Sequence, residues 1–268
     1  MRPSISWKEF NSLAGYQRII NVKKLIIIAG GWSVLEGIKK ELWSYLLENY
    51  FKQQNTEIWS LNFSYKFMPL LPDRQIWIDK TFFEDNIEDI LFLRHKDVAL
   101  STRINSKIKR LHYISNRSVR KKMEEEFKVI EQFKTNCNMK EAYKGNLLFC
   151  GRQGLVGIFA TSLAILKGFK EIYWLGMDYG NLTVKDKKTH WYQDMIPSAN
   201  FKPEIKSHGI GVPAHYRDTK TDKINYMIED FNVFLKYKDV NIKNVSLQSN
   251  IQSFEKISYD EFFKLIAG

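Results

Sequence analysis

The sequence contains few cysteines and no long hydrophobic run. Among its 268 residues only Cys137 and Cys150 are cysteines, and their spacing is not that of metal ligands. This scarcity fits a reducing compartment and argues against a disulfide framework or a zinc site. The longest apolar runs, such as 25–29 and 173–175, have the length of strands, far below the ~20 residues that span a bilayer. Because the first residues, MRPSISWKEF, also lack the apolar core of a signal peptide, we expect a cytoplasmic protein.

Several familiar site motifs are also missing. There is no H-x-x-x-H or H-E-x-x-H spacing for zinc, no G-x-S-x-G nucleophile turn, and no D-x-D motif of metal-dependent sugar transferases. Neither G-x-G-x-x-G nor a Walker A sequence is present, which weakens a dinucleotide or P-loop interpretation. The chain also lacks internal repeats and low-complexity linkers. We therefore expect one domain over 1–268, large enough to bury roughly 70–75% of its unfolded surface without a metal or a disulfide.

Lysine and arginine outnumber the acidic residues by 41 to 30, which gives a net charge of +11. The basic residues are spread widely, and one dense cluster lies at 103–122. Such a cluster is either the solvated face of a helix or a surface for phosphate, lipid or nucleic acid. An anionic membrane surface, such as the inner one, and nucleic acid therefore stay open as partners, and so does a homo-oligomer.

The first clear structural pattern is a buried strand, a glycine turn and a helix. Residues 24–29, KLIIIA, are apolar and rich in β-branched side chains, and the turn that follows is Gly30, Gly31, Trp32 and Ser33. Apolar residues then recur with helical spacing over 35–49. A strand that is apolar along its whole length is typical of a parallel sheet covered on both faces.

The rest of the chain alternates strand and helix patterns. We expect further strands at 57–62, 75–79, 98–101, 147–150, 170–178 and 244–247, and helices at 104–140, 156–167 and 220–236. Gly168 is placed to cap the second of these helices. The alternation predicts an α/β, Rossmann-like fold with a mostly parallel, doubly wound sheet. The polar segment at about 180–213 is longer than an ordinary connection and is predicted to be a lid.

Glycines and polar residues gather at the predicted carboxyl ends of the strands, where doubly wound sheets bind their ligands. The Gly30–Ser33 turn either lets the backbone approach a ligand phosphate at a helix start or is a plain strand–helix turn. Asn62 and Asp79 end two other strands and either contact the ligand or cap the next helix. Asp178 ends a further strand, where its carboxylate binds a ribose hydroxyl, a metal or an amine, or makes a structural hydrogen bond. We expect these ends to form one pocket.

Histidine is the residue best suited to proton transfer near neutral pH. His190, His208 and His215 lie in or beside the predicted lid, and at least one of them is expected to be an ordinary surface residue. Cys150 precedes a glycine turn and is interpreted as a buried structural thiol rather than a nucleophile.

Five segments, in order, resemble one superfamily. LIIIAGGWSVL (25–35) and IWSLNFSYKF (58–67) are similar to the glycine turn and the Asn-ended strand of the bacterial sialyltransferases that make lipooligosaccharide ends. Residues 156–180 resemble their serine-glycine helix and the L-G-x-K-E-I-Y-L-x-G-I-D-F strand after it. Residues 214–236 and 244–254 resemble their post-lid histidine with its helix and their terminal strand and serine. The same core pattern occurs in archaeal 6-hydroxymethylpterin diphosphokinase-like proteins, and in phage proteins with a His–Trp pair after the G-x-D strand, as in this chain.

The sialyltransferase resemblance implies transfer of a sialic-acid-like sugar from a CMP-linked donor to a glycan or another hydroxyl acceptor, with no required cofactor or metal. The reaction is an in-line displacement at the anomeric carbon. His215 is implied as the general base and Tyr192 as a lid residue that stabilises the departing phosphate. His190, from the His–Trp pair, is a further catalytic candidate. The resemblance implies that the turn of Gly30, Gly31, Trp32 and Ser33 and the side chain of Asn62 hold the donor phosphate and cytidine, with added contacts near Gly157. The other candidate nucleotide and substrate contacts are Asp79, Gly154, Asp178 and Ser249.

The chain departs from the family pattern at three positions. Trp32 replaces the proline of the turn, Gly30 its asparagine, and Val156 the serine before the helix glycine. Polar contacts to CMP-sialic acid are therefore partly missing, whereas the expected fold is little affected. Two alternatives stay open. One is a diphosphokinase or another phosphotransferase that uses ATP and Mg²⁺ held by Asp79 and Asp178. The other is a non-catalytic protein that binds nucleic acid or a membrane surface through its basic cluster.

Overall fold

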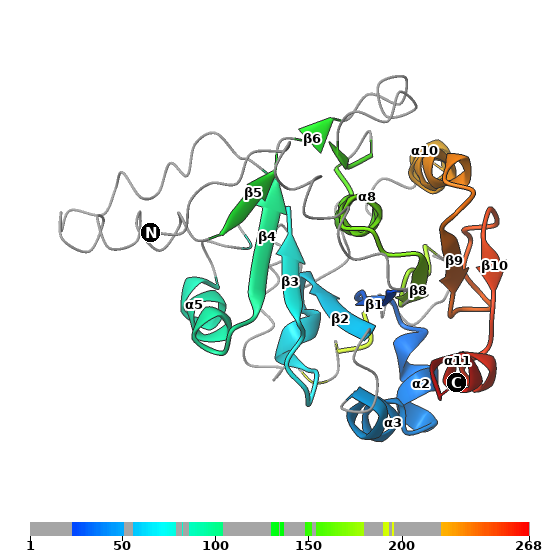
Figure 1. The fold of residues 1–268 in the computed structure, drawn as a ribbon. Helices are drawn as coiled ribbons and strands as arrows, with labels where there is room; N and C mark the ends of the chain where they lie inside the picture. The colour runs from blue at the N-terminus through cyan, green and yellow to red at the C-terminus, as the bar shows by residue number, and fades with distance from the viewer. Residues whose placement is uncertain are drawn as a thin grey trace.

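The computed structural model describes residues 23–50, 56–78, 82, 86–103, 130–133, 135–136, 148–151, 154–179, 190–192, 195 and 221–267. In chain order (Figure 1), the elements are β1 (Lys24–Ile28), α2 (Val34–Lys39), α3 (Leu42–Tyr50), β2 (Thr56–Leu61), the 3-10 helix η1 (Asn62–Lys66), β3 (Arg74–Trp77), α5 (Ile87–His95), β4 (Ala99–Arg103), β5 (Glu131–Phe133), β6 (Thr135–Asn136), β7 (Leu148–Phe149), α8 (Val156–Leu166), β8 (Glu171–Leu175), α10 (Thr221–Asp230), the 3-10 helix η6 (Phe231–Lys236), β9 (Asn241–Asn244), β10 (Glu255–Lys256) and α11 (Tyr259–Ala267). Asp79, His208 and His215 lie outside the described residues, as do most of the predicted lid and nearly all of the basic cluster.

Eight strands form one sheet in the order β10-β9-β8-β1-β2-β3-β4-β5, and every neighbouring pair is parallel. β1 lies inside the sheet between β2 and β8, with Ile28 opposite Ser60 on one side and Leu175 on the other. Helices cover both faces, so the predicted Rossmann-like α/β class is confirmed. β6 and β7 pair with each other in a separate two-stranded sheet.

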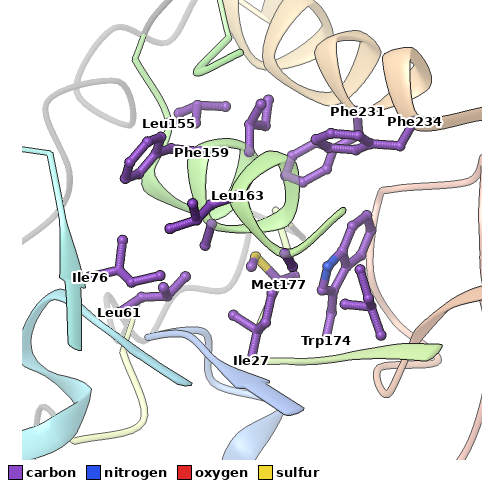
Figure 2. Close-up of a cluster of buried hydrophobic side chains, with 14 of the residues drawn as sticks. Ile27, Leu61, Ile76, Leu155, Phe159, Leu163, Trp174, Met177, Phe231 and Phe234 are labelled. Atoms are coloured by element: carbon purple, nitrogen blue, oxygen red, sulfur yellow. The ribbon is translucent and has the colours of Figure 1, made fainter. Parts of the chain in front are cut away.

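Alternating side chains of β1 divide the core into two layers. Leu25 and Ile27 belong to the cluster under α8 and η6, whereas Ile26 and Ile28 belong to the cluster closed by α2, α3, α5 and α11. Figure 2 shows the side chains of α8 packed between the strands and the aromatic rings of η6. In Figure 1, α2, α3, α5 and α11 lie on the opposite side of the sheet from α8. The apolar run in β1 is therefore buried on both faces, as predicted.

The predicted helices are interrupted or wrong at three places. The helical spacing over 35–49 is split into α2 and α3, because Glu41 between them has a φ of 62°, outside the right-handed helical region. The helix predicted at 220–236 is α-helical to Asp230 and then tightens into η6. The helix predicted over 104–140 is wrong where the chain is described, since β5 and β6 lie there. Pairing of β5 with β4 outweighs the charged, helix-like composition of this region.

The most consequential shift concerns the strand predicted at 170–178. The strand ends at Leu175, because Gly176 takes a φ of 75° that few other residues adopt. Asp178 therefore lies in the loop that follows β8 rather than at the last position of the strand. This places its side chain beyond the carboxyl edge of the sheet.

The remaining strands are found within about three residues of their predicted positions. The strand expected at 244–247 lies at Asn241–Asn244, and the one expected at 147–150 is β7, which pairs outside the main sheet. Gly168 follows α8 with a φ of 85°, as expected of a C-terminal cap. Among the described helices, none has both the length and the apolar character needed to cross a bilayer.

Candidate functional site

The candidate site lies at the carboxyl ends of β1 and β8, where the strand order reverses. From β1 the chain builds the sheet outward through β2 to β5, and β8 then enters on the other side of β1. Two parallel strands whose connections leave in opposite directions open a crevice beyond their ends, which is where such sheets bind ligands. The Gly30–Ser33 turn follows β1, and the loop from Gly176 to Asp178 follows β8. The pocket predicted from the sequence corresponds to this edge.

Gly31 lets the two loops approach each other closely. Its amide donates a hydrogen bond to the carbonyl of Gly176, with N and O 2.9 Å apart. A Cβ atom at Gly31 would lie 2.3 Å from that carbonyl oxygen and 2.6 Å from Oδ2 of Asp178. Neither neighbour can give way cheaply, because one is backbone and the other is a buried carboxylate. Glycine is therefore required here for the contact between β1 and β8 loops.

Asp178 accepts the first polar contacts of the α2 turn. Its Oδ2 accepts a hydrogen bond from the Ser33 backbone N at 2.8 Å, and its Oδ1 accepts one from the Ser33 hydroxyl at 2.5 Å. Burial raises the pKa of Asp178, while the hydrogen bonds from Ser33 partly oppose that rise. From the sequence, the backbone of this turn was expected either to approach a ligand phosphate or to form a plain strand–helix turn. In the structure, the carboxylate of Asp178 is bound to the backbone N of Ser33.

Ser249 and Asn250 hold the loop after β8 from the C-terminal side. The buried Ser249 hydroxyl donates to the carbonyl of Met177 at 2.9 Å, and the backbone N of Asn250 donates to the carbonyl of Asp178 at 2.9 Å. These bonds join the chain after β9 to the loop that carries Asp178. Ser249, which the family resemblance marked as a ligand contact, thus has a positioning role in the geometry observed.

Three residues of the predicted lid, His190, Trp191 and Tyr192, are bound to the end of β1. Trp191 donates twice, from its backbone N to the carbonyl of Gly30 and from its indole Nε1 to the carbonyl of Ala29, both at 3.0 Å. A Cβ at Gly30 would meet His190 Cδ2 at 2.5 Å and the Tyr192 hydroxyl at 3.1 Å. The half-buried imidazole of His190 therefore lies directly against Gly30. We call these three residues the HWY anchor.

The ring of Tyr192 is buried rather than exposed to the crevice. It stacks on Phe67 with the ring planes 8° apart and the centroids 4.9 Å apart, and Trp191 packs near Trp43. Burial raises the pKa of the Tyr192 hydroxyl above its ordinary value. Its hydroxyl nevertheless points toward Gly30, the position from which the predicted contact with a departing phosphate would be made.

Asn62 directly follows β2, next to the end of β1, and has a φ of 50°. Its carbonyl accepts a hydrogen bond from Gln75 Nε2 at 2.8 Å, whereas its side-chain Oδ1 is buried and has no hydrogen-bond partner among the described residues. It starts η1 instead of capping it through its side chain. At this edge of the sheet, the atom is available to accept a hydrogen bond from a water molecule or a ligand.

Gly157 and Gly154 lie around the start of α8. A Cβ at Gly157 would lie 2.6 Å from the sulfur of Met177, so this glycine lets α8 pack against the residue before Asp178. Gly154 has a φ of 69° in the turn before the helix, and no described contact joins it to Gly30 or Gly31. Trp32 is half-buried in the β1 turn.

Sequence reasoning missed two residues that shape this site. Gly176 needs its positive φ to turn the chain, and a Cβ there would lie 2.9 Å from the carbonyl of Ala29. Tyr259 of α11 is buried with its hydroxyl unpaired among the described residues, and the charge of Asp178 contributes to its raised pKa after burial itself. The glycine two residues before Asp178 was a usable signal for the first. No local pattern signals the second.

The chain was compared with protein family models, curated proteins and solved structures. No protein family model matches the chain, and neither the curated proteins nor the solved structures contain a significant match. Within the described ranges, no three His, Cys, Asp or Glu side chains are grouped as metal ligands would be.

Proposed function

We propose that the chain is a transferase that moves a sugar from a nucleotide-activated donor to a hydroxyl acceptor at the β1–β8 edge. The observation that supports this most is the convergence of the Gly30–Ser33 turn, the Asp178 loop and the HWY anchor at the switch point of a parallel sheet. Nucleotide-dependent folds of this class bind their ligands in that crevice. The resemblance to sialyltransferases makes a CMP-linked, sialic-acid-like donor our first candidate.

The reaction would be an in-line displacement. A histidine takes the proton of the acceptor hydroxyl, the acceptor oxygen forms a bond to the anomeric carbon, and the bond from that carbon to the phosphate oxygen breaks. The electron pair of the broken bond leaves with the nucleotide. His215 is the proposed base from the resemblance, and His190 is the histidine that stands at this edge among the described residues. These steps account for the proton, the bonds and the electron pair without a metal or a cofactor.

The phosphotransferase alternative is less well supported by the geometry. It uses Asp178 as one of two carboxylates beside Mg²⁺, but Asp178 is buried and accepts hydrogen bonds on both oxygens from Ser33. Magnesium prefers carboxylates that it shares with water and phosphate oxygens. We therefore place sugar transfer first and keep Mg²⁺ dependence as the measurement that separates the two. Catalysis in the cytoplasm, or at the inner membrane surface, belongs to the same proposal.

A thermal-shift panel of nucleotides and nucleotide sugars, with and without Mg²⁺, tests the proposal. A matching nucleotide at about 100 times its Kd should add roughly 2.7 kcal/mol, a rise in Tm of roughly 5–10 °C for a chain of this size. His215→Ala should abolish sugar transfer and leave nucleotide binding intact. His95→Ala, at an exposed histidine that ends α5, is the matched control.

Two results would count against the proposal. If none of the nucleotides changes the Tm, the chain is not a nucleotide-dependent transferase. If His215→Ala transfers sugar at the wild-type rate, the assigned base is wrong. Binding of ATP that depends strictly on Mg²⁺ would favour the phosphotransferase instead.

A further inference from the structure

The carboxylate of Asp178 is bound as an external anion would be. Only 4% of the residue is exposed, and its two oxygens accept hydrogen bonds from the backbone N and the hydroxyl of Ser33. Both donors are uncharged, and their hydrogen bonds oppose the rise that burial causes in the pKa of the carboxyl group. Anion sites at the starts of helices are built from the same kind of donors.

The phenol of Tyr259 adds a second observation at the same place. Its hydroxyl is buried without a hydrogen-bond partner among the described residues, and the negative charge of Asp178 is one cause of its raised pKa. The ring is held against Gly37 of α2, where a Cβ would lie 2.3 Å from Cε1 of the tyrosine. The carboxylate is thus buried against Ser33, and the Tyr259 ring packs on the helix whose first turn that carboxylate holds.

We infer that Asp178 is a positioning residue whose carboxylate takes the place of a ligand anion at the first turn of α2 and fixes the Gly30–Ser33 turn. The chain that it fixes includes Gly31, which packs on Gly176, and Gly30, on which His190 and Trp191 rest. A substrate phosphate is therefore recognised by groups other than the backbone N of Ser33. This inference does not depend on sugar transfer and stands or falls separately from the proposed function.

The test removes the side-chain carboxylate of Asp178 and supplies formate, a small carboxylate, in solution. Asp178→Ala removes the bound oxygens and leaves the Ser33 donors facing a small cavity. We expect a loss in Tm of roughly 10 °C, since two buried Ser33 donors lose their acceptor and a cavity is left. Sodium formate at about 100 mM should recover several degrees of this loss and return the Ser33 amide resonance toward its wild-type position in ¹⁵N NMR spectra, because formate binding stabilises the folded state.

Ser101→Ala is the matched control. Ser101 is also fully buried and its hydroxyl also accepts a hydrogen bond, from Arg74, but it lies on β4 away from the glycine turn. Formate should not raise its Tm, and sodium chloride at equal ionic strength should not rescue either variant. Equal effects of formate on both variants would overturn the inference, because a purely structural loss is not restored by a carboxylate.

A second test uses the wild-type protein and so does not depend on whether a variant folds. Titration with inorganic phosphate should leave the Ser33 amide resonance in place, because Asp178 already holds it. A saturable shift of this resonance would show that an outside anion displaces Asp178, and the inference would be wrong. Asp178→Asn fills the cavity with an amide, so formate should have no effect on its Tm. Formate rescue of that variant would contradict the assigned site.

Discussion

Two carboxylates, at opposite ends of the sheet, are held in different ways. Asp178 lies beyond the carboxyl ends of β1 and β8 and is bound by uncharged donors. Glu131 begins β5 and accepts from the guanidinium of Arg74 at 2.5 Å, with Lys167 Nζ 3.4 Å from the same oxygen. The guanidinium in turn lies over the Trp59 ring, 5.2 Å from its centroid. One carboxylate has no described cation among its causes of pKa shift, and the other has two.

The pKa values of the two acids move in opposite directions for this reason. Burial raises the pKa of Asp178, and the hydrogen bonds do not offset it. Burial also acts to raise the pKa of Glu131, but the charges of Arg74 and Lys167 and the hydrogen bonds to Arg74 and Ser101 together lower it. The ion pairs of Glu131 with Arg74 and Lys167 connect strands of the sheet to the end of α8, so their role is to stabilise the fold. A buried acid without a counter-charge at a switch point is typical of a functional edge.

The largest effect should come from adding a methyl group at Gly31. Gly31→Ala forces a Cβ to within 2.3 Å of the Gly176 carbonyl, so the two loops must separate. We expect a loss of about 3 kcal/mol in the free energy of unfolding, at the upper end of overpacking costs. Urea denaturation followed by fluorescence measures it.

Gly168→Ala is the control at the other end of the sheet. It has a φ of 85° but no atom within 4 Å of a Cβ, so only the backbone conformation is strained, at about 1 kcal/mol. Equal losses in the two variants would mean that the close approach at Gly31 is not what makes the carboxyl edge different.

Much of the fold could be predicted from local sequence patterns. The apolar run before Gly30 located β1, because a strand buried on both faces is apolar along its whole length. The small residues after Val156 located α8, because they let a helix pack closely on a sheet. The short β5 was missed because its pairing with β4 is a long-range contact that composition does not encode.

The candidate site was predicted in position but not in its contacts. Ser33 and Asp178 are 145 residues apart, and Trp191 and Ala29 are 162 apart, so only the folded sheet brings them together. The sequence left two interpretations of Gly30 to Ser33, a phosphate contact or a plain strand–helix turn. It could not indicate that a side chain of the same protein would accept hydrogen bonds there. The turn at Gly176 was overlooked because a glycine inside an apolar run fits a strand as well as its end.

Opposite pH dependences should sharpen the contrast between the acids. The folded pKa of Asp178 is raised above its ordinary 3.8, so its contribution to stability is fully present at lower pH and is lost as the pH rises through the folded pKa. The folded pKa of Glu131 is lowered below its ordinary 4.5, so its contribution is present above that value and is lost as the pH falls through the folded pKa.

Unfolding free energies measured from pH 3 to 8 for wild type, Asp178→Asn and Glu131→Gln test these signs. The wild-type advantage over Asp178→Asn should shrink as the pH rises, and the advantage over Glu131→Gln should shrink as the pH falls. At neutral pH the Glu131→Gln loss should be about 1 kcal/mol, since 42% of that side chain is exposed and water screens the pair. Slopes of the same sign would remove the distinction drawn between the two ends.

The smallest loss of unfolding free energy is expected when one hydrogen bond between the HWY anchor and the end of β1 is removed. Trp191→Phe keeps the backbone hydrogen bond to Gly30 and an aromatic ring, but removes the indole N–H that donates to the Ala29 carbonyl. Loss of one buried hydrogen bond costs about 1 kcal/mol. Trp43→Phe, in the ring that packs beside Trp191, is the matched control for lost ring volume.

The informative readout is the position of His190 rather than stability alone. If the indole bond holds the anchor over Gly30, the His190 ring resonances should shift in Trp191→Phe and stay near wild type in Trp43→Phe. Unchanged His190 resonances in both variants would mean that packing of Tyr192 on Phe67 is enough to place the imidazole. The contact between His190 and the carboxyl end of β1 would then depend on the aromatic stack, and the indole bond would contribute only to stability.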